Sequence, residues 1–210
     1  MMKDLVQKNR SYRRFYQEKK ITEEQVRELL DIARLTPSGA NKQPIRYMYT
    51  CTEEENNKVF PYLRWAGYYQ DWDGPEEGER PAAYIILLSP AGVNAPQDEG
   101  IIGQTILLSA TEEGMGGCFI ANVDRAGLAE AIQVPEGYQI KLVIALGYPK
   151  EEVVIDEITK DGDIKYYRDS KQTHHVPKIK LEDLIIKYDI EEFGMVNDSY
   201  YEIRRKSRNI

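Results

Sequence analysis

The clearest helical pattern along the chain begins after Thr22. Thr22 can cap a helix, and Gln25 three residues later completes a capping box. Apolar residues then recur at the spacing of the buried face of an amphipathic helix, namely Val26, Leu29, Leu30 and Ala33. The longest helical pattern runs over residues 97–113 and stops at Gly114. Shorter helices are expected over residues 3–9, 53–63, 125–132 and 181–188.

A continuous apolar run over residues 82–88 has the length of a strand. Such a run predicts a central strand that is buried on both faces. Shorter strands are expected at residues 45–51, 118–121 and 141–146, and Asp161-Gly162 between 153–158 and 164–167 is a β-hairpin signal. Helices and strands are interspersed without strict alternation, which favours an α+β fold over a doubly wound one.

The length, charge and cysteine content narrow the class of protein. A chain of 210 residues fits one domain better than two, so we expect a domain over residues 1–188 and a C-terminal extension over 189–210. The net charge of −7 argues against a nucleic-acid partner, which would call for an excess of Lys and Arg. Two cysteines give no disulfide framework. The first residues lack a signal peptide, and no run approaches the roughly 20 apolar residues of a membrane helix. We expect a cytoplasmic protein that does not enter a membrane.

Basic residues near the N-terminus form the first candidate site. Arg10 and Arg13 are three apart, so on a helical turn they can converge on one point with Ser11 between them. Cations and a short hydroxyl are what a phosphate monoester requires. The alternative is a solvated basic turn.

Two loops and one strand supply further candidates. The stretch 37–44 places Ser38, Asn41 and Gln43 between two prolines, and such groups can read the polar edge of a heterocycle. Gly116 and Gly117 follow the long helix and allow backbone to approach a flat ligand, although a helix stop and a tight turn would look the same.

The last candidate is Lys178 and Lys180. In extended chain, alternate side chains point the same way, so both lysines can face one anion. An ordinary surface strand would have the same pattern. The glycines do not form the Gly-x-Gly-x-x-Gly fingerprint of a Rossmann domain, so a tightly held dinucleotide is not expected.

The order of these motifs is more specific than any one of them. Arg-Ser-x-Arg, Pro-Ser-x-x-Asn-x-Gln-Pro, Gly-Met-Gly-Gly and Lys-x-Lys follow one another over residues 3–186, with Gly-Tyr-Pro at 147–149 after an apolar strand. In this order the chain resembles the nitroreductase family of flavoproteins. It departs from the family at Asn9, where a basic residue is common, and at Ile45, where an aromatic one is common.

The resemblance implies a three-layer α-β-α fold with a mostly antiparallel mixed sheet, and a homodimer that binds FMN between its subunits. Arg10, Ser11 and Arg13 would hold the FMN phosphate, joined by Lys178 and Lys180. Ser38, Asn41 and Gln43 would meet the flavin ring or ribityl chain from the other subunit, and Gly116 and Gly117 would pass backbone along the ring. The C-terminal extension can then pack on the partner subunit.

The resemblance also implies a reaction. NAD(P)H would donate hydride to FMN, which then reduces a small nitroaromatic, quinone or similar acceptor by a ping-pong mechanism, with no metal and no catalytic side chain. Reductive dehalogenation, flavin-dependent oxidation and a non-catalytic FMN-binding protein are the alternatives. The choice between NADH and NADPH stays open.

An aromatic group precedes an acidic loop at residues 73–79. Trp65, Tyr69 and Trp72 are candidates for the wall of the substrate pocket, stacking on a flat acceptor. Core packing or anchoring of the loop is the alternative. His174-His175 has no third ligand at a convincing spacing, so no metal site is expected there.

Overall fold

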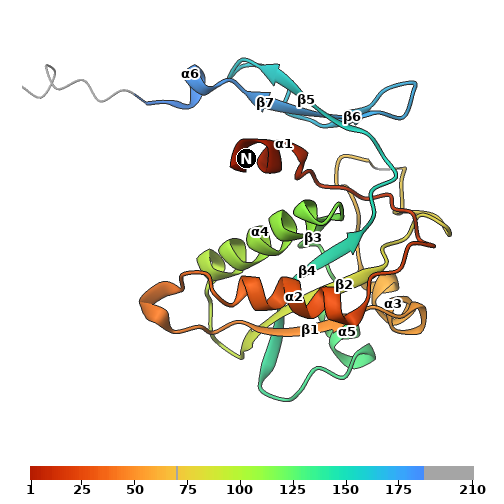
Figure 1. Ribbon diagram of the computed structural model, residues 1–210, viewed down its shortest axis with the longest axis vertical. Coiled ribbons are helices and arrows are strands. Elements are labelled where there is room, and N and C mark those ends of the chain that lie inside the picture. The colour runs from red at the N-terminus through yellow and green to blue at the C-terminus, as the bar shows by residue number, and fades with distance from the viewer. Residues whose placement is uncertain (70, 187–210) are drawn as a thin grey trace, which may run out of the picture. The chain divides into compact units, whose positions relative to one another are not determined.

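A computed structural model of the chain (Figure 1) describes residues 1–69 and 71–186. The chain divides into two compact units. Among the described residues, the first consists of 1–155 and 165–176, and the second contains 156–164 and 177–186. The predicted extension at 189–210 lies outside the described residues, so the expected boundary at residue 188 stays a prediction. No helix among the described residues is long and apolar enough to cross a bilayer.

The first unit is built on a four-stranded antiparallel sheet. Its strands are β1 (Arg46–Thr50), β2 (Ala83–Pro90), β3 (Gly116–Ile120) and β4 (Tyr138–Gly147), in the order β1-β2-β4-β3. Strand β2, predicted as a central strand, is buried at every position from Ala83 to Ser89. Its neighbour β4 is longer at both ends than the apolar run 141–146 indicated.

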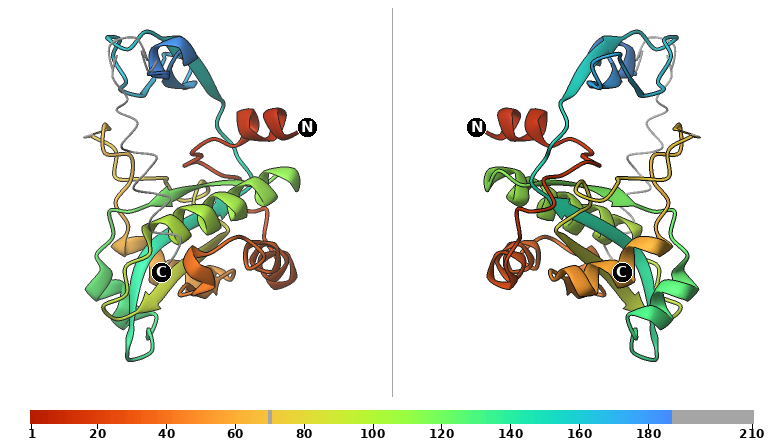
Figure 2. Two further views of the ribbon diagram at one scale, coloured as in Figure 1. Left: turned by 90° about the vertical axis from the view of Figure 1, so that its left-hand side faces the viewer. Right: turned by 90° about the vertical axis from the view of Figure 1, so that its right-hand side faces the viewer.

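Helices cover both faces of this sheet. On one face, α2 (Glu23–Ala33) and α4 (Pro96–Glu112) pack against Ala83, Ile85 and Leu87 of β2. On the other, α3 (Glu53–Val59) and α5 (Arg125–Ala131) pack against the alternating set Tyr84, Ile86 and Leu88. Figure 2 shows these two layers from the sides. The expected three-layer α+β fold is confirmed.

Local signals explain where the helices begin and end. Thr22 caps α2, and its hydroxyl and the Gln25 side chain form the predicted capping box. Thr52 and Glu55 do the same for α3. The helix expected over 53–63 ends at Val59 and continues as a 3-10 turn, η2 (Phe60–Tyr62), because Pro61 cannot donate a helical hydrogen bond. The chain opens with α1 (Met2–Lys8), close to the expected 3–9.

The hairpin expected around Asp161-Gly162 is wrong. Strands β5 (Val153–Ile158), β6 (Tyr167–Arg168) and β7 (His174–Ile179) form a sheet in the order β5-β7-β6, so β5 and β6 are not neighbours. A turn does form, since the Gly162 N–H donates to Thr159 at 3.0 Å. The actual hairpin joins β6 to β7 at residues 169–173, where the Asp169 carboxylate accepts from the Lys171 and Thr173 N–H groups. The side chain of Asp169 stabilises this turn more directly than a Gly alone can.

The last expected helix is shorter than predicted. Helix α6 covers Leu181–Leu184, whereas the pattern indicated 181–188. Ile185 is already extended, and residues 187 and 188 lie outside the described part of the chain. Both cysteines are free, as expected from their number.

A substitution at Gly117 can test how closely β3 and β4 pack. A Cβ at Gly117 would lie 2.0 Å from the Ala145 carbonyl oxygen, which is backbone and cannot move aside. We expect Gly117→Ala to lower the free energy of unfolding by about 1–3 kcal/mol or more. Gly100→Ala is the control, since Gly100 lies in α4 with no atom within 4 Å of its missing Cβ. It should leave stability unchanged or raise it by up to about 1 kcal/mol in urea denaturation. Equal effects would contradict the packing argument.

Candidate functional site

The N-terminal motif lies against strand β3. Ser11 forms a parallel bridge with Gly117, and the Tyr12 N–H donates to the Gly117 carbonyl at 3.1 Å. A Cβ at Gly116 would lie 2.6 Å from the Tyr12 ring and 2.8 Å from Pro149. The structure therefore brings the Arg-Ser-x-Arg motif and the glycine pair side by side. It also explains both glycines by packing within the chain itself.

Asn9 attaches this motif to helix α4. Its buried carboxamide donates to the Thr111 hydroxyl at 3.0 Å and accepts from the Gln104 side chain at 3.2 Å. The departure from the family at position 9 thus has a structural role, because a basic side chain could not accept from Gln104.

Arg10 is one of the two motif arginines, and neither it nor Arg13 forms an ion pair among the described residues. One of its terminal nitrogens donates to the Val6 carbonyl at 2.6 Å, while its Nε is buried without a partner. Burial lowers the pKa of Arg10, because the charged form loses hydration. A buried donor without a partner is unfavourable, so an anion at this point would stabilise the arrangement.

Arg13 is held by neutral groups. Its Nη1 lies 3.2 Å from the Ser11 carbonyl and 3.3 Å from His174 Nε2, and its guanidinium lies over the Tyr166 ring, 5.0 Å from the centroid. The nearby carboxylate of Glu151 pairs instead with Arg168, at 2.9 Å. Glu151 also accepts from the backbone N–H groups of Arg13 and Arg14, which turns the chain at this point.

The aromatic candidates have different surroundings. Trp65 is buried in the core beside Phe60, which agrees with the core-packing alternative, and its part in a substrate pocket stays a prediction. Tyr69 donates to or accepts from His174 Nδ1 at 2.7 Å and meets Trp72 edge-on at 6.1 Å. Trp72 is half-buried, packs against the core and lies under the Arg168 guanidinium at 4.8 Å. These contacts anchor both rings within the first unit.

The loop around residues 38–43 lies at the other end of α4. The Ser38 hydroxyl donates to the buried carboxylate of Asp98, in the first turn of α4, and accepts from the Gln43 N–H at 2.9 Å. Asp98 also accepts from the Gly39 N–H at 3.2 Å. The Ser38 hydroxyl is thus engaged within the loop, where it shapes the turn.

Asn41 and Gln43 are exposed on this loop and have positive φ values of 53° and 46°. Non-glycine residues rarely adopt this conformation, and when it is held by surrounding contacts it is typical of functional sites. The Gln43 carboxamide donates to the Asn41 side chain at 3.0 Å. Two amide groups are thereby presented together to solvent.

The two sets of candidates do not meet within one chain. One set is attached to α4 at Thr111 and the other at Asp98, and this separation corresponds to about 20 Å along the helix axis. Figure 1 shows the loop between α2 and β1 beside one end of α4. Lys178 and Lys180 belong to the second unit, where the Lys180 N–H donates to the Ile158 carbonyl at 2.9 Å. Their part in a site stays a prediction.

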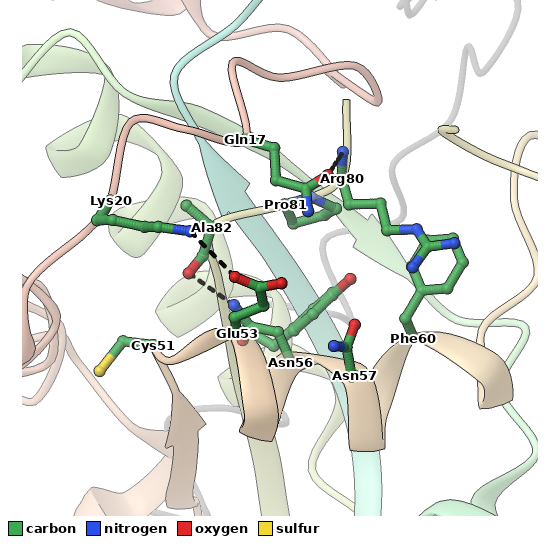
Figure 3. A pocket seen from close by; sticks show the side chains of 11 residues that line it. Gln17, Lys20, Cys51, Glu53, Asn56, Asn57, Phe60, Arg80, Pro81 and Ala82 are labelled. Carbon is green, nitrogen blue, oxygen red and sulfur yellow. Dashed lines mark hydrogen bonds and ion pairs between the residues drawn. The ribbon is translucent and has the colours of Figure 1, made fainter. Parts of the chain in front are cut away.

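Two hollows in the described part of the chain contain none of these candidates. The one in Figure 3 has a volume of about 20 Å³, room for about one water, and lies between α3 and the segment before β2. In it, Lys20 faces Glu53 at 3.8 Å, and Arg80 lies over the Phe60 ring at 4.3 Å. The other is an open groove of about 730 Å³ between α2 and β1, lined by charged side chains with Tyr47 and Tyr49.

Sequence reasoning missed Asp98, Glu151 and His174. Asp98 has the position of an ordinary acidic residue in a helix's first turn, and His174 was considered only as a metal ligand. No local pattern marks Glu151, because its partners are far away in the sequence.

Comparisons with known proteins agree with this architecture. A sequence model described as the nitroreductase family matches residues 6–148. A candidate NADH dehydrogenase/NAD(P)H nitroreductase from Archaeoglobus fulgidus is 26% identical over 148 residues, covering 66% of this chain and 80% of that protein. An iodotyrosine deiodinase from Thermotoga neapolitana is 23% identical over 169 residues, covering 72% and 90%.

Solved structures show the same fold. A nitroreductase family protein from Clostridium novyi superimposes with a TM-score of 0.59 at 22% identity, covering 71% of this chain and 86% of that one. An FMN-dependent nitroreductase from Clostridium difficile gives a TM-score of 0.57 at 21% identity, covering 70% and 87%.

His174 makes stability depend on pH. Burial, followed by the charges of Arg13, Arg168 and His175, lowers its pKa from 6.5 to about 4. Between these values the unfolded chain takes up a proton at this residue and the folded chain does not. The free energy of unfolding therefore falls as the pH drops through this window.

The test compares the unchanged protein with His174→Gln, in urea denaturation across that window. Between pH 6.5 and 4, the free energy of unfolding of the unchanged protein should fall by on the order of 1–3 kcal/mol more than that of the variant. Parallel curves for the two proteins would contradict this assignment.

Proposed function

The chain belongs to the nitroreductase family, and we propose that it is an FMN-dependent oxidoreductase that oxidises NAD(P)H and reduces nitroaromatic, quinone or similar small acceptors. The observation that carries the proposal is the pair of guanidinium groups beside strand β3. Arg10 and Arg13 flank Ser11, and neither forms an ion pair within the described residues. The family match supports an oxidoreductase, and the cofactor and the acceptor are part of the proposal.

The residues present fit the phosphate end of FMN. The buried Nε of Arg10 lacks a partner, and the Glu151 carboxylate, which accepts from the Arg13 backbone N–H, is paired with the side chain of Arg168. This leaves positive charge in excess next to a short hydroxyl, which is the donor set that a phosphate monoester takes.

In the proposal the flavin ring meets Asn41 and Gln43, from a second copy of the chain. Their amide groups can donate to and accept from the polar edge of a heterocycle. Bound FMN would supply the hydride-accepting chemistry that no side chain possesses. The chain's own part is to bind and orient it, because Asp98 and Ser38 hold the loop and Asn9 holds the phosphate segment.

The separation of the two sets supports the homodimer of this proposal. Each chain offers phosphate-type groups at one end of α4 and ring-type groups at the other, about 20 Å apart along the helix. A second chain can bring the complementary set to each site. Exposed apolar side chains support this assembly, since Ile101 of α4 is 41% exposed and Phe119 of β3, whose ring lies beside Gly103 of α4, is 40% exposed. Exposed apolar surface that forms a patch is typical of interfaces.

Reductive dehalogenation is a second candidate. The iodotyrosine deiodinase relative covers 72% of this chain, and an enone reductase is among the structural relatives. Turnover with each acceptor distinguishes the two reactions. Consumption of NAD(P)H with a quinone supports the leading proposal, whereas release of iodide from iodotyrosine without quinone turnover supports the second. A yellow protein that consumes no nucleotide with any acceptor would be a flavin-binding protein.

The phosphate assignment predicts a difference between two flavins. The purified protein should bind FMN and show flavin absorbance, and riboflavin, which lacks the phosphate, should bind far more weakly. Arg10→Ala and Arg13→Ala should each weaken FMN binding by about 1–3 kcal/mol and change riboflavin binding little. Fluorescence titration of the flavin-free protein measures all of these affinities. Arg34→Ala is the control, since Arg34 is an exposed arginine at the C-cap of α2 and pairs with Asp31. Equal affinities for the two flavins would rule out the phosphate site.

The proposed dimer predicts that two exposed apolar residues, Ile101 of α4 and Phe119 of β3, lie in the interface. Phe119→Asp and Ile101→Asp should each raise the dimer dissociation constant by tenfold or more, about 1.4 kcal/mol, because each places a charge in an apolar contact. Ile32→Asp is the matched control, since Ile32 is 40% exposed on α2. Sedimentation velocity over a dilution series measures the effect. A monomer that still binds FMN tightly would overturn the shared site.

A further inference from the structure

His174 joins three segments of the first unit that are distant in the sequence. Its Nε2 lies 3.3 Å from Arg13 Nη1, and its Nδ1 lies 2.7 Å from the Tyr69 hydroxyl. Its backbone N–H donates to the Glu152 carbonyl at 2.9 Å, which fixes the start of β7. The side chain is 1% exposed, so water does not compete for either ring nitrogen.

The partners of the two ring nitrogens determine where the proton lies. A guanidinium can only donate, so Nε2 must accept from Arg13 and carries no hydrogen. A neutral imidazole then carries its hydrogen on Nδ1, which donates to the Tyr69 oxygen. The doubly protonated ring would direct an N–H at the Arg13 N–H, with the charges of Arg13 and Arg168 nearby, and is excluded at neutral pH.

This arrangement restricts Arg13 without neutralising it. The guanidinium is held on one side by His174, is covered on one face by the Tyr166 ring, and is tied by Nη1 to the Ser11 carbonyl. A carboxylate in the place of His174 would neutralise the arginine, whereas an imidazole keeps its full charge available. The remaining N–H donors of the fork can therefore serve an anion at Ser11.

We infer that His174 is a positioning residue that, as the neutral Nδ1–H tautomer, fixes the Arg13 guanidinium for a phosphate monoester bound at Ser11. Through its other nitrogen it ties the aromatic segment at Tyr69 and Trp72 to the same arginine. This inference rests on the proposed function, because the phosphate is that of the proposed FMN. His174 touches no ligand itself and acts through Arg13.

The tautomer can be measured on the full chain without any ligand. The protein contains two histidines, so ¹⁵N-histidine labelling gives two imidazole spin systems, and the His175→Gln variant assigns them. The spectrum of His174 at neutral pH should be that of a neutral ring protonated on Nδ1. A ring protonated on Nε2, or on both nitrogens, would overturn the inference whatever the variants do.

The positioning role is tested by comparing two flavins with two substitutions. His174→Phe keeps a ring but removes the acceptor, so it should weaken FMN binding on the order of tenfold, the cost of about one hydrogen bond to a charged group, and leave riboflavin binding unchanged. His174→Gln can return an acceptor to Arg13 and should restore most of the preference for FMN. His175→Gln should bind both flavins as the unchanged protein does.

The outcomes separate this inference from the proposed function. Equal affinity of the unchanged protein for FMN and riboflavin would overturn the phosphate site and the inference with it. A normal preference for FMN that survives in His174→Phe would overturn the inference alone, as would an equal loss of both flavins. If His174→Phe does not fold, the imidazole spectrum of the unchanged protein and the His174→Gln affinities decide.

Discussion

The burial of strand β2 on both faces is the constraint on which the rest of the first unit depends. Seven successive residues from Ala83 to Ser89 have no exposed side, so each face requires its own layer of helices. Alternate side chains then divide the core into two clusters, one under α2 and α4 and one under α3 and α5. Burying a single large apolar side chain contributes roughly 1.5–3 kcal/mol, so a shift of register by one residue would exchange the two layers at a large cost.

Helix α4 connects the packed sheet to the candidate site. Because it packs on β2 and β4 along its length, its two ends are fixed in position and distance. Polar residues attach a functional segment at each end, with Asn9 near Thr111 and Ser38 at Asp98. The helix thus separates two groups of residues that one proposed ligand would need together. The proposed second chain would bring the complementary group of residues to each site.

The charge pattern beside β3 has its own physical logic. Glu151 is 2% exposed and is satisfied by Arg168 and by two backbone N–H groups, so it turns the chain without neutralising Arg13. His174 provides an uncharged acceptor, and Asn9 provides a neutral connection to α4. Each arrangement restrains the segment while its cationic charge is preserved, which is unfavourable for an isolated protein and favourable once an anion is bound.

The sequence by itself determined the layers and most element positions. The apolar run at 82–88, the capping box at Thr22 and the stop at Gly114 are local signals. The structure contains the element that each of them predicts. The order of the polar motifs indicated the family. It did not reveal that Gly116 and Gly117 are required by Tyr12, Pro149 and Ala145, since those contacts join distant segments. The tertiary structure alone decided that Trp65 is core, that β6 pairs with β7, and that His174 lies between Arg13 and Tyr69. The reason is that short-range patterns record how a segment folds, whereas the partner of a buried polar group or ring is set by whichever distant segment the packed sheet brings against it.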